Sequence, residues 1–542
     1  MEDLINDITI KNPAPEELAQ EVEAIIQKEQ EQYGNAGNIA PSTNAINDTL
    51  TALRNNEDGD TWLLINQQKN KFCFDHSLGK WFRWNGHFWQ EDTIDQVYST
   101  IDEVVSQYSK EYDRQSWIRK KAVLQHNADD AKKAADLQKE LLKRMFELQG
   151  LRRKKDILYL AARNDNSLAI SGDEWDRNLF LLGCRNGVIN LETGEFGNGR
   201  PEDYIRTVAP TKWKGINEPA PTWEKFLNDI FEDNADLVAY IQRFFGYAIS
   251  GSVRDHIIAV FWGAKGRNGK GTLFETLRYV LGELITPIDV EMLTGDYRNR
   301  SSAAPSPDIM SLRGRRLVWA SEAEEGHQFA VGKIKLLTGA DTLTGRPPFG
   351  KSNITFSPTH KIALLTNNTP KLTSLDQAFL ERLHLIPLKL SFIDNPVDTS
   401  FQRKCDPKLP EKLKNEAAGI LAWLVRGFLE WQDKGLKPPK LVLDTIEQYK
   451  KDEDIIGLFL SDYTREDPNG SVRAQLLYNN YKFWCENCGH KYVSLKKFGE
   501  RMTEIYEKGT DSDGKYYKGL SLIVHTQEAA PPADDCGGAD YA

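Results

Sequence analysis

A glycine-rich loop at residues 264–272 directly follows an apolar run, residues 257–262, that predicts a buried strand. The loop consists of Ala264, Lys265, Gly266, Arg267, Asn268, Gly269, Lys270, Gly271 and Thr272. Apolar residues then recur at helical spacing up to Leu281. Backbone N–H groups of such a loop and the N-terminus of the helix attract anions, and Lys270 can reach the β- and γ-phosphates. The sequence therefore predicts a nucleoside triphosphate site.

Two positions of this loop depart from the usual phosphate-loop pattern. Ala264 occupies the place of the first glycine, and Gly271 occupies the place of the Ser or Thr whose hydroxyl binds Mg²⁺. Thr272 follows directly, so either its hydroxyl or a water molecule is expected to take that role.

Three acidic residues follow a second apolar run, residues 317–321. Acidic groups at the end of a neighbouring strand hold Mg²⁺ and polarise the attacking water in triphosphatases. We expect Glu322 to be the general base and a metal ligand, with Glu324 and Glu325 sharing the metal. The alternative is a solvated acidic loop.

A third apolar run, residues 361–366, ends at Asn367, and an arginine, Arg382, follows the apolar pair 379–380 after one glutamate. An Asn at the tip of a strand can orient the attacking water or contact the γ-phosphate, although the same residues also suit a turn. Arg382 is a candidate arginine finger for the site of a neighbouring subunit. A salt bridge to Glu381 is the plainer alternative.

Two groups of basic residues suit the phosphates of a nucleic acid. Alternating segments around residues 341–356 predict a β-hairpin with Lys351 near its tip, and Lys333, Lys335 and Arg346 lie nearby in the sequence. Further on, a Ser-capped helix beginning near residue 494 exposes Lys496, Lys497 and Arg501. Simple solvation of a small domain is an equal alternative for this second group. The pair Cys485 and Cys488 lacks a second pair of ligands nearby, which argues against zinc.

Composition indicates a globular chain of 542 residues, enough for about three domains. The sequence contains no run of apolar residues that could span a membrane and no secretory signal at its N-terminus, and its six scattered cysteines suit a reducing compartment. We therefore expect a cytoplasmic protein without a membrane partner. The net charge of −10 does not exclude nucleic acid, because basic residues can be confined to a channel.

The expected fold class is α/β, with a phosphate-loop core, an α+β domain before it and a small domain after it. Segment composition and Pro-rich punctuation set the expected boundaries. They are a flexible segment 1–58, an N-terminal domain 59–218, the ATPase domain 219–437, a C-terminal domain 438–525 and a disordered tail 526–542.

The motifs occur in an order that resembles the superfamily 3 helicases, and specifically the helicase portion of the phage/plasmid and poxvirus-type primase–helicase family. The motifs that carry the resemblance are residues 266–270, 321–326, 335–341, 366–368 and 382–387. The resemblance implies an AAA+-like core, a helicase-associated N-terminal domain and a C-terminal winged-helix domain. It further implies a homo-hexameric ring with ATP and Mg²⁺ between subunits, and a pore hairpin around Lys351 that draws one DNA strand 3′ to 5′.

We therefore expect an ATP-dependent DNA helicase of a phage, plasmid or other mobile element, acting on single-stranded and forked DNA in replication. Glu381 stands where the family often has a second arginine. The roughly 60 residues before the helicase region are too few for a primase domain, so we expect no primase activity and possible partnership with a separate primase or initiator protein. Two other readings stay open: a DNA-binding initiator regulated by ATP, and an AAA+ remodelling or defence ATPase that acts on protein.

Overall fold

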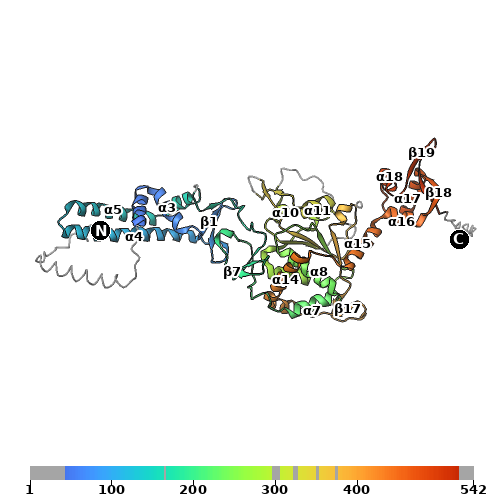
Figure 1. Ribbon diagram of the computed structural model, residues 1–542, viewed down its shortest axis with the longest axis horizontal. Coiled ribbons are helices and arrows are strands. Elements are labelled where there is room, and N and C mark those ends of the chain that lie inside the picture. Colours follow the sequence, from blue (N-terminus) through green and yellow to red (C-terminus); the bar gives the residue numbers. More distant parts are fainter. Residues whose placement is uncertain are drawn as a thin grey trace, which may run out of the picture. The chain divides into compact units, whose positions relative to one another are not determined.

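The computed structural model describes residues 43–163, 166–295, 305–321, 327–348, 353–372 and 376–523. It divides into two compact units, one reaching residue 174 and the other beginning at residue 175, with residues 86–88 grouped with the second. Figure 1 follows the chain from the helices of the first unit to the sheet of the second. The α/β class expected from the sequence is confirmed.

The first unit combines helices with a four-stranded sheet of order β3-β2-β1-β4. Its elements are α2 (Thr43–Arg54), α3 (Asn56–Gln68), β1 (Phe72–Asp75), β2 (Lys80–Trp84), β3 (Trp89–Glu91), α4 (Ile101–Leu124), α5 (Ala128–Gln149), α6 (Leu151–Ala161) and β4 (Ala169–Ile170). The expected domain boundary at residue 58 is wrong, because it falls inside α3, and Ala52 and Leu53 of α2 already belong to the buried core. The polar composition of residues 43–58 concealed these two apolar anchors.

A buried carboxylate joins the helices of this unit. Asp60 on α3 is fully buried, and it accepts hydrogen bonds from Arg144 of α5 at 2.9 Å and from Arg153 of α6 at 2.6 Å. The hydroxyl of Tyr108 on α4 donates a third bond to it at 2.7 Å. A buried charge requires such partners, because an unpaired one carries a large desolvation penalty. Asp60 thus connects four helices.

The second unit begins with a small four-stranded sheet and two helices. Its sheet has the order β7-β6-β5-β8. The elements are β5 (Leu181–Cys184), β6 (Gly187–Asn190), β7 (Phe196–Gly197), β8 (Val208–Ala209), α7 (Pro221–Ile230) and α8 (Ala235–Ile249). The expected domain boundary between residues 218 and 219 lies just before α7.

A five-stranded parallel sheet of order β10-β11-β14-β9-β15 forms the centre of the second unit. Its strands are β9 (Ile258–Trp262), β10 (Ile285–Pro287), β11 (Leu317–Ser321), β14 (Lys361–Thr366) and β15 (Leu383–Pro387). The other elements around it are α9 (Lys270–Leu281), α10 (Pro307–Met310), α11 (Val331–Thr338), β12 (Leu343–Gly345), β13 (Ile354–Phe356), α12 (Gln377–Leu380), β16 (Ser391–Ile393), β17 (Gln402–Lys404), α13 (Leu409–Asn415) and α14 (Ala417–Lys434). Because all five strands are parallel, their carboxyl ends share one edge.

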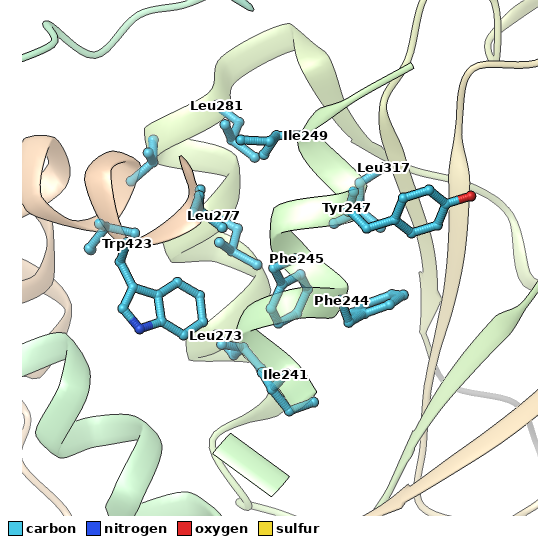
Figure 2. Close-up of a cluster of buried hydrophobic side chains, with 14 of the residues drawn as sticks. Ile241, Phe244, Phe245, Tyr247, Ile249, Leu273, Leu277, Leu281, Leu317 and Trp423 are labelled. Atoms are coloured by element: carbon cyan, nitrogen blue, oxygen red, sulfur yellow. The ribbon is translucent and has the colours of Figure 1, made fainter. Parts of the chain in front are cut away.

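Alternating residues of β9 face two separate cores. Ala259 and Phe261 belong to a cluster with α8, α9 and α14, whereas Ile258 and Val260 belong to one with α11. Figure 2 shows side chains of α8, α9 and α14 converging in the first cluster. There the ring of Phe274 meets that of Phe261 edge-on, with centroids 5.1 Å apart. This contact packs α9 against β9, the two elements that flank the glycine-rich loop.

The last part of the chain forms a small α+β structure after α15 (Lys440–Glu453). Its elements are α16 (Ile455–Tyr463), β18 (Thr464–Arg473), α17 (Ala474–Cys488), α18 (Leu495–Ile505), β19 (Lys508–Asp511) and β20 (Gly514–Leu522). The strands pair antiparallel in the order β18-β20-β19, over a core that contains Phe459, Tyr481 and Phe498. The predicted Ser cap is confirmed, since Ser494 accepts a hydrogen bond from the backbone of Lys497. In the described residues, no helix is both long and apolar enough to cross a bilayer.

Candidate nucleotide-binding site

The carboxyl edge of the parallel sheet opens into a cavity of about 1050 Å³. The glycine-rich loop after β9, Ser321 at the end of β11 and Asn367 after β14 all line it. Residues that lie far apart in the sequence, Phe226 of α7 and Phe392 of β16, form part of the wall. The structure therefore brings together the loop, the end of the second strand and the Asn that the sequence pointed to.

Lys270 lies in this cavity among neutral oxygen atoms. Its Nζ atom donates to Oδ1 of Asn367 at 2.9 Å and to Oδ1 of Asn268 at 3.0 Å. Burial lowers the pKa of Lys270 to about 8. Within the described residues, no carboxylate forms an ion pair with this ammonium group. A desolvated cation without a counterion favours the arrival of an anion such as a phosphate.

The loop adopts a backbone that suits a phosphate cradle. Gly266 and Gly269 have φ values of 65° and 85°, where glycine carries no steric penalty. Arg267 shares this region with φ 48°. A turn of this kind that leads into the N-terminus of a helix, here α9, is the arrangement whose backbone N–H groups bind anions.

Asn268 anchors the loop from beneath, a role that its sequence position did not reveal. Its side chain is 2% exposed, and its Nδ2 atom donates to the carbonyl oxygens of Leu388 at 3.2 Å and Leu390 at 2.8 Å. The backbone N–H of Phe392 donates to the carbonyl of Arg267 at 2.9 Å. The chain after β15 thus holds the loop in place.

Of the four residues expected to hold magnesium, Thr272 alone lies in the described part of the chain. Thr272 lines the cavity from the first turn of α9. A Cβ atom added at Gly271 would meet nothing within 4 Å, so the usual hydroxyl residue would fit there. Glu322, Glu324 and Glu325 lie outside the described residues, and their roles stay predictions. In the residues that are described, no three His, Cys, Asp or Glu side chains group to hold a metal.

Arg382 lies at the other edge of the sheet. The residue after it, Leu383, pairs with Ile258 at the beginning of β9, whereas the loop follows the end of that strand. Five residues of strand separate these edges by roughly 17 Å. The guanidinium of Arg382 donates to the carbonyl of Lys335 at 3.1 Å and to Oγ1 of Thr338 at 2.9 Å. Arg382 therefore does not reach the cavity of its own chain, and Glu381 accepts a hydrogen bond from Gln377 instead.

The candidate DNA-binding residues near the parallel sheet are the hairpin that carries Lys351 and three basic residues close to it, Lys333, Lys335 and Arg346. The predicted hairpin is confirmed by β12 and β13, in which Gly345 pairs with Ile354, but Lys351 lies outside the described residues. Lys335 forms an ion pair with Asp376 at 3.0 Å, and Lys333 has one with Asp308 at 3.9 Å. The backbone N–H of Arg346 is bonded to Ser306.

The candidates on α18 differ from one another. Lys496 and Lys497 are exposed. Arg501, in contrast, donates to Asp454 and to Glu504, both at 2.8 Å. Asp454 also caps α16, so Arg501 holds two helices together, and its proposed contact with DNA competes with these ion pairs.

Two family models match the chain, one before the parallel sheet and one after it. Residues 61–232 match the family model described as "D5 N terminal like", and residues 451–520 match the one described as "Poxvirus D5 protein-like". "Putative helicase L207/L206" of Acanthamoeba polyphaga mimivirus is 30% identical over 483 residues, which is 83% of this chain and 48% of that protein. "Putative helicase 121R" of Invertebrate iridescent virus 3 is 28% identical over 60% of this chain and 37% of that protein.

The chain thus spans about half the length, or less, of these curated relatives. Among solved structures, the A form of the apo NrS-1 C-terminal region gives a TM-score of 0.45 at 11% identity, covering 84% of this chain and 97% of that one. A likeness at this TM-score supports no argument about shared detail. The names of the viral relatives agree with the helicase resemblance that the motifs indicate. The chain belongs to the poxvirus-type D5 primase–helicase family.

Proposed function

We propose that this chain is an ATP-dependent DNA helicase that acts in the replication of a virus or another mobile element. The observation that carries the proposal is the contact between Lys270 and Asn367 inside the cavity at the carboxyl edge of the sheet. Viral relatives named as helicases support a helicase-like replication protein. The proposal includes that the protein hydrolyses ATP, that it unwinds DNA and that it moves 3′ to 5′.

The residues of the cavity fit a triphosphate. Backbone N–H groups of residues 266–272 would hold the β- and γ-phosphates, and Lys270 would exchange its two amide oxygens for phosphate oxygens. Asn367, released from the lysine, would then orient the attacking water, with Glu322 as its base. Mg²⁺ bound near Thr272, with Glu324 and Glu325 close by, would neutralise the charge on the phosphates.

We propose further that the site is shared between subunits of a ring. Arg382 lies at the amino edge of the sheet, too far away to act on its own chain's nucleotide. An arginine in that position can complete the site of a neighbour that packs head to tail, and head-to-tail contacts close into rings. A homo-hexamer with an AAA+-like core is the assembly we propose. The strand order, in which β9 lies between β14 and β15, suits such a core.

Two parts of the chain would contact DNA. The hairpin of β12 and β13 would present Lys351 to a single strand in the ring's pore. The order α16, β18, α17, α18, β19, β20 over a three-stranded antiparallel sheet supports a winged-helix domain, with α18 as the helix that docks on DNA. Its exposed Lys496 and Lys497 would contact phosphates.

The test is strand separation by the purified chain. ATP and a forked duplex with a 3′ single-stranded tail should give unwinding, and a fork with only a 5′ tail should not. Hydrolysis of ATP without strand separation on either fork would overturn the helicase proposal. It would favour an initiator or a remodelling ATPase instead.

A further inference from the structure

A run of four basic residues, Arg152 to Lys155, begins α6 in the first unit. The structure separates this run into two pairs. Arg153 faces the core, where it bonds Asp60, and Lys154 lies 3.4 Å from Asp102 of α4. Arg152 and Lys155 are exposed, and they form no ion pair with any residue that the structure describes. Half of the run is thus structural, and the other half remains available to a partner.

The available pair belongs to a longer stripe along one side of the helix. Arg152, Lys155 and Tyr159 follow one another at intervals of three and four residues, so they share one face of α6, and Arg163 follows just beyond the end of the helix. From Arg152 to Tyr159 the stripe is roughly 10 Å long. Asp156 lies beside it but forms no ion pair with Arg152 in the described residues. The opposite face of the helix carries Ile157, Leu158 and Ala161, which are buried.

An exposed aromatic ring lies within this stripe. Tyr159 is 60% exposed although it is a large apolar side chain on an ordered helix. The guanidinium of Arg163 lies over its ring at 3.8 Å from the centroid and donates to its backbone carbonyl. Basic side chains that flank an exposed ring match the two features of a single-stranded nucleic acid, a line of phosphates and unstacked bases.

We propose that the outer face of α6 (Arg152, Lys155 and Tyr159), together with Arg163 just beyond the end of the helix, binds single-stranded nucleic acid. Arg152 and Lys155 contact phosphates, and Tyr159 stacks on a base while Arg163 holds its ring. Duplex DNA also has phosphates, but its bases are stacked on one another, so none of them can stack on the ring of Tyr159. A nuclear-import receptor is another partner that binds basic runs of this kind. The ion pairs of Arg153 and Lys154 disfavour it, because they lock half of the run into a folded helix.

Crosslinking of the full chain tests this site separately from the helicase proposal. The probe is a single-stranded oligodeoxythymidine in which one base is 5-iodouracil, and mass spectrometry of the digested product locates the crosslink. We expect a crosslink on Tyr159. The double variant Arg152→Glu/Lys155→Glu should lose it, and the salt dependence of oligonucleotide binding should fall by about 1.4 in log–log slope for the two lost phosphate contacts.

A matched control is the double variant Arg119→Glu/Lys120→Glu. These cations are also exposed, and they lie roughly 25 Å along α4 from the Asp102 contact with α6. The control should keep the crosslink and the slope. Tyr159→Ala, which changes no charge, should weaken binding of the single strand and leave binding of a duplex unchanged. Thermal unfolding of each variant confirms that it is folded.

Crosslinks that map only elsewhere, or an unchanged slope in the folded double variant, would overturn the proposal. Equal loss of single-strand and duplex binding in Tyr159→Ala would overturn the stacking role. ATP hydrolysis and unwinding are measured independently of the crosslink. A missing crosslink at Tyr159 therefore does not bear on the nucleotide site, and a missing strand separation does not bear on the nucleic-acid site of α6.

Discussion

The ammonium group of Lys270 lies 2.9 Å from the side-chain oxygen of Asn367. The two residues follow neighbouring strands of the sheet, β9 and β14. The two residues are 97 positions apart in the chain, and parallel pairing of β9 with β14 brings them together. The same lysine also bonds Asn268, so two neutral amides hold it where phosphates are expected. This arrangement leads to the first two predictions.

Lys270→Ala should reduce ATP hydrolysis by about 10²–10³-fold or more, because it removes the cation that stabilises charge on the transferred phosphate. Steady-state hydrolysis by the purified variant measures this. Lys434→Ala, an exposed lysine on α14, is a suitable control and should retain full activity. Normal hydrolysis by Lys270→Ala would show that the nucleotide binds elsewhere.

ATP affinity should depend on pH through Lys270. Its pKa of about 8 in the free protein means that the group is charged below pH 8 and loses its proton above it. Bound phosphates favour the charged form, so they raise the pKa of the lysine. Affinity should therefore be steady below pH 8 and fall up to about tenfold per pH unit above it. A titration of ATP binding between pH 6.5 and 9.5 checks this, and Lys270→Gln should lose this dependence.

A mixing experiment tests the shared site. Arg382→Ala and Lys270→Ala should each hydrolyse almost no ATP, since one lacks the finger and the other the lysine. In mixed rings, an intact lysine from the first variant meets an intact arginine from the second. At equal amounts and random assembly, about a quarter of the sites regain both groups. Hydrolysis that stays at background at every ratio would contradict a site shared between subunits.

Asn268→Ala should destabilise the second unit by about 1–3 kcal/mol, because it leaves the buried carbonyls of Leu388 and Leu390 without their donor. Denaturant unfolding measures the loss. The loop should also lose its fixed position, so ATP affinity should fall with stability. Exposed Asn487 on α17 provides a control, and its replacement by Ala should leave both quantities unchanged.

Asp60→Ala should destabilise the first unit by about 3–5 kcal/mol, since it leaves Arg144 and Arg153 buried without their shared carboxylate. Hydrogen exchange of α3, α5 and α6 should report the change. The exposed Asp156 offers a contrast, and Asp156→Ala should leave exchange unaltered. A wild-type exchange pattern in Asp60→Ala would show that the core alone holds these helices.

The sequence predicted the phosphate loop, the strands on either side of it and Asn367 because each is a local pattern. A run of apolar residues followed by glycines, or by a polar tip, can be recognised without the fold. The capped helix at Ser494 and the hairpin of β12 and β13 were recognised in the same way. These features depend on neighbours along the chain.

Features that depend on partners distant in the chain were missed. Asn268 looked like one more loop residue, because its acceptors lie about 120 positions later. Phe226 and Phe392 lack any motif, yet both line the cavity. Arg501 was read as an exposed cation, whereas Asp454 of another helix holds it. Helix α2 and the first residues of α3 were read as part of a flexible segment, because only tertiary packing buries their few apolar residues.

The position of Arg382 at the edge opposite the phosphate loop has a consequence for how the protein is switched on. If Arg382 acts only on the nucleotide of a neighbouring subunit, a monomer binds ATP but cannot hydrolyse it. Turnover per chain would then rise with protein concentration and collapse on dilution, by mass action alone. The protein would need no inhibitor to remain inactive at low concentration. Assembly of subunits on DNA would start ATP hydrolysis.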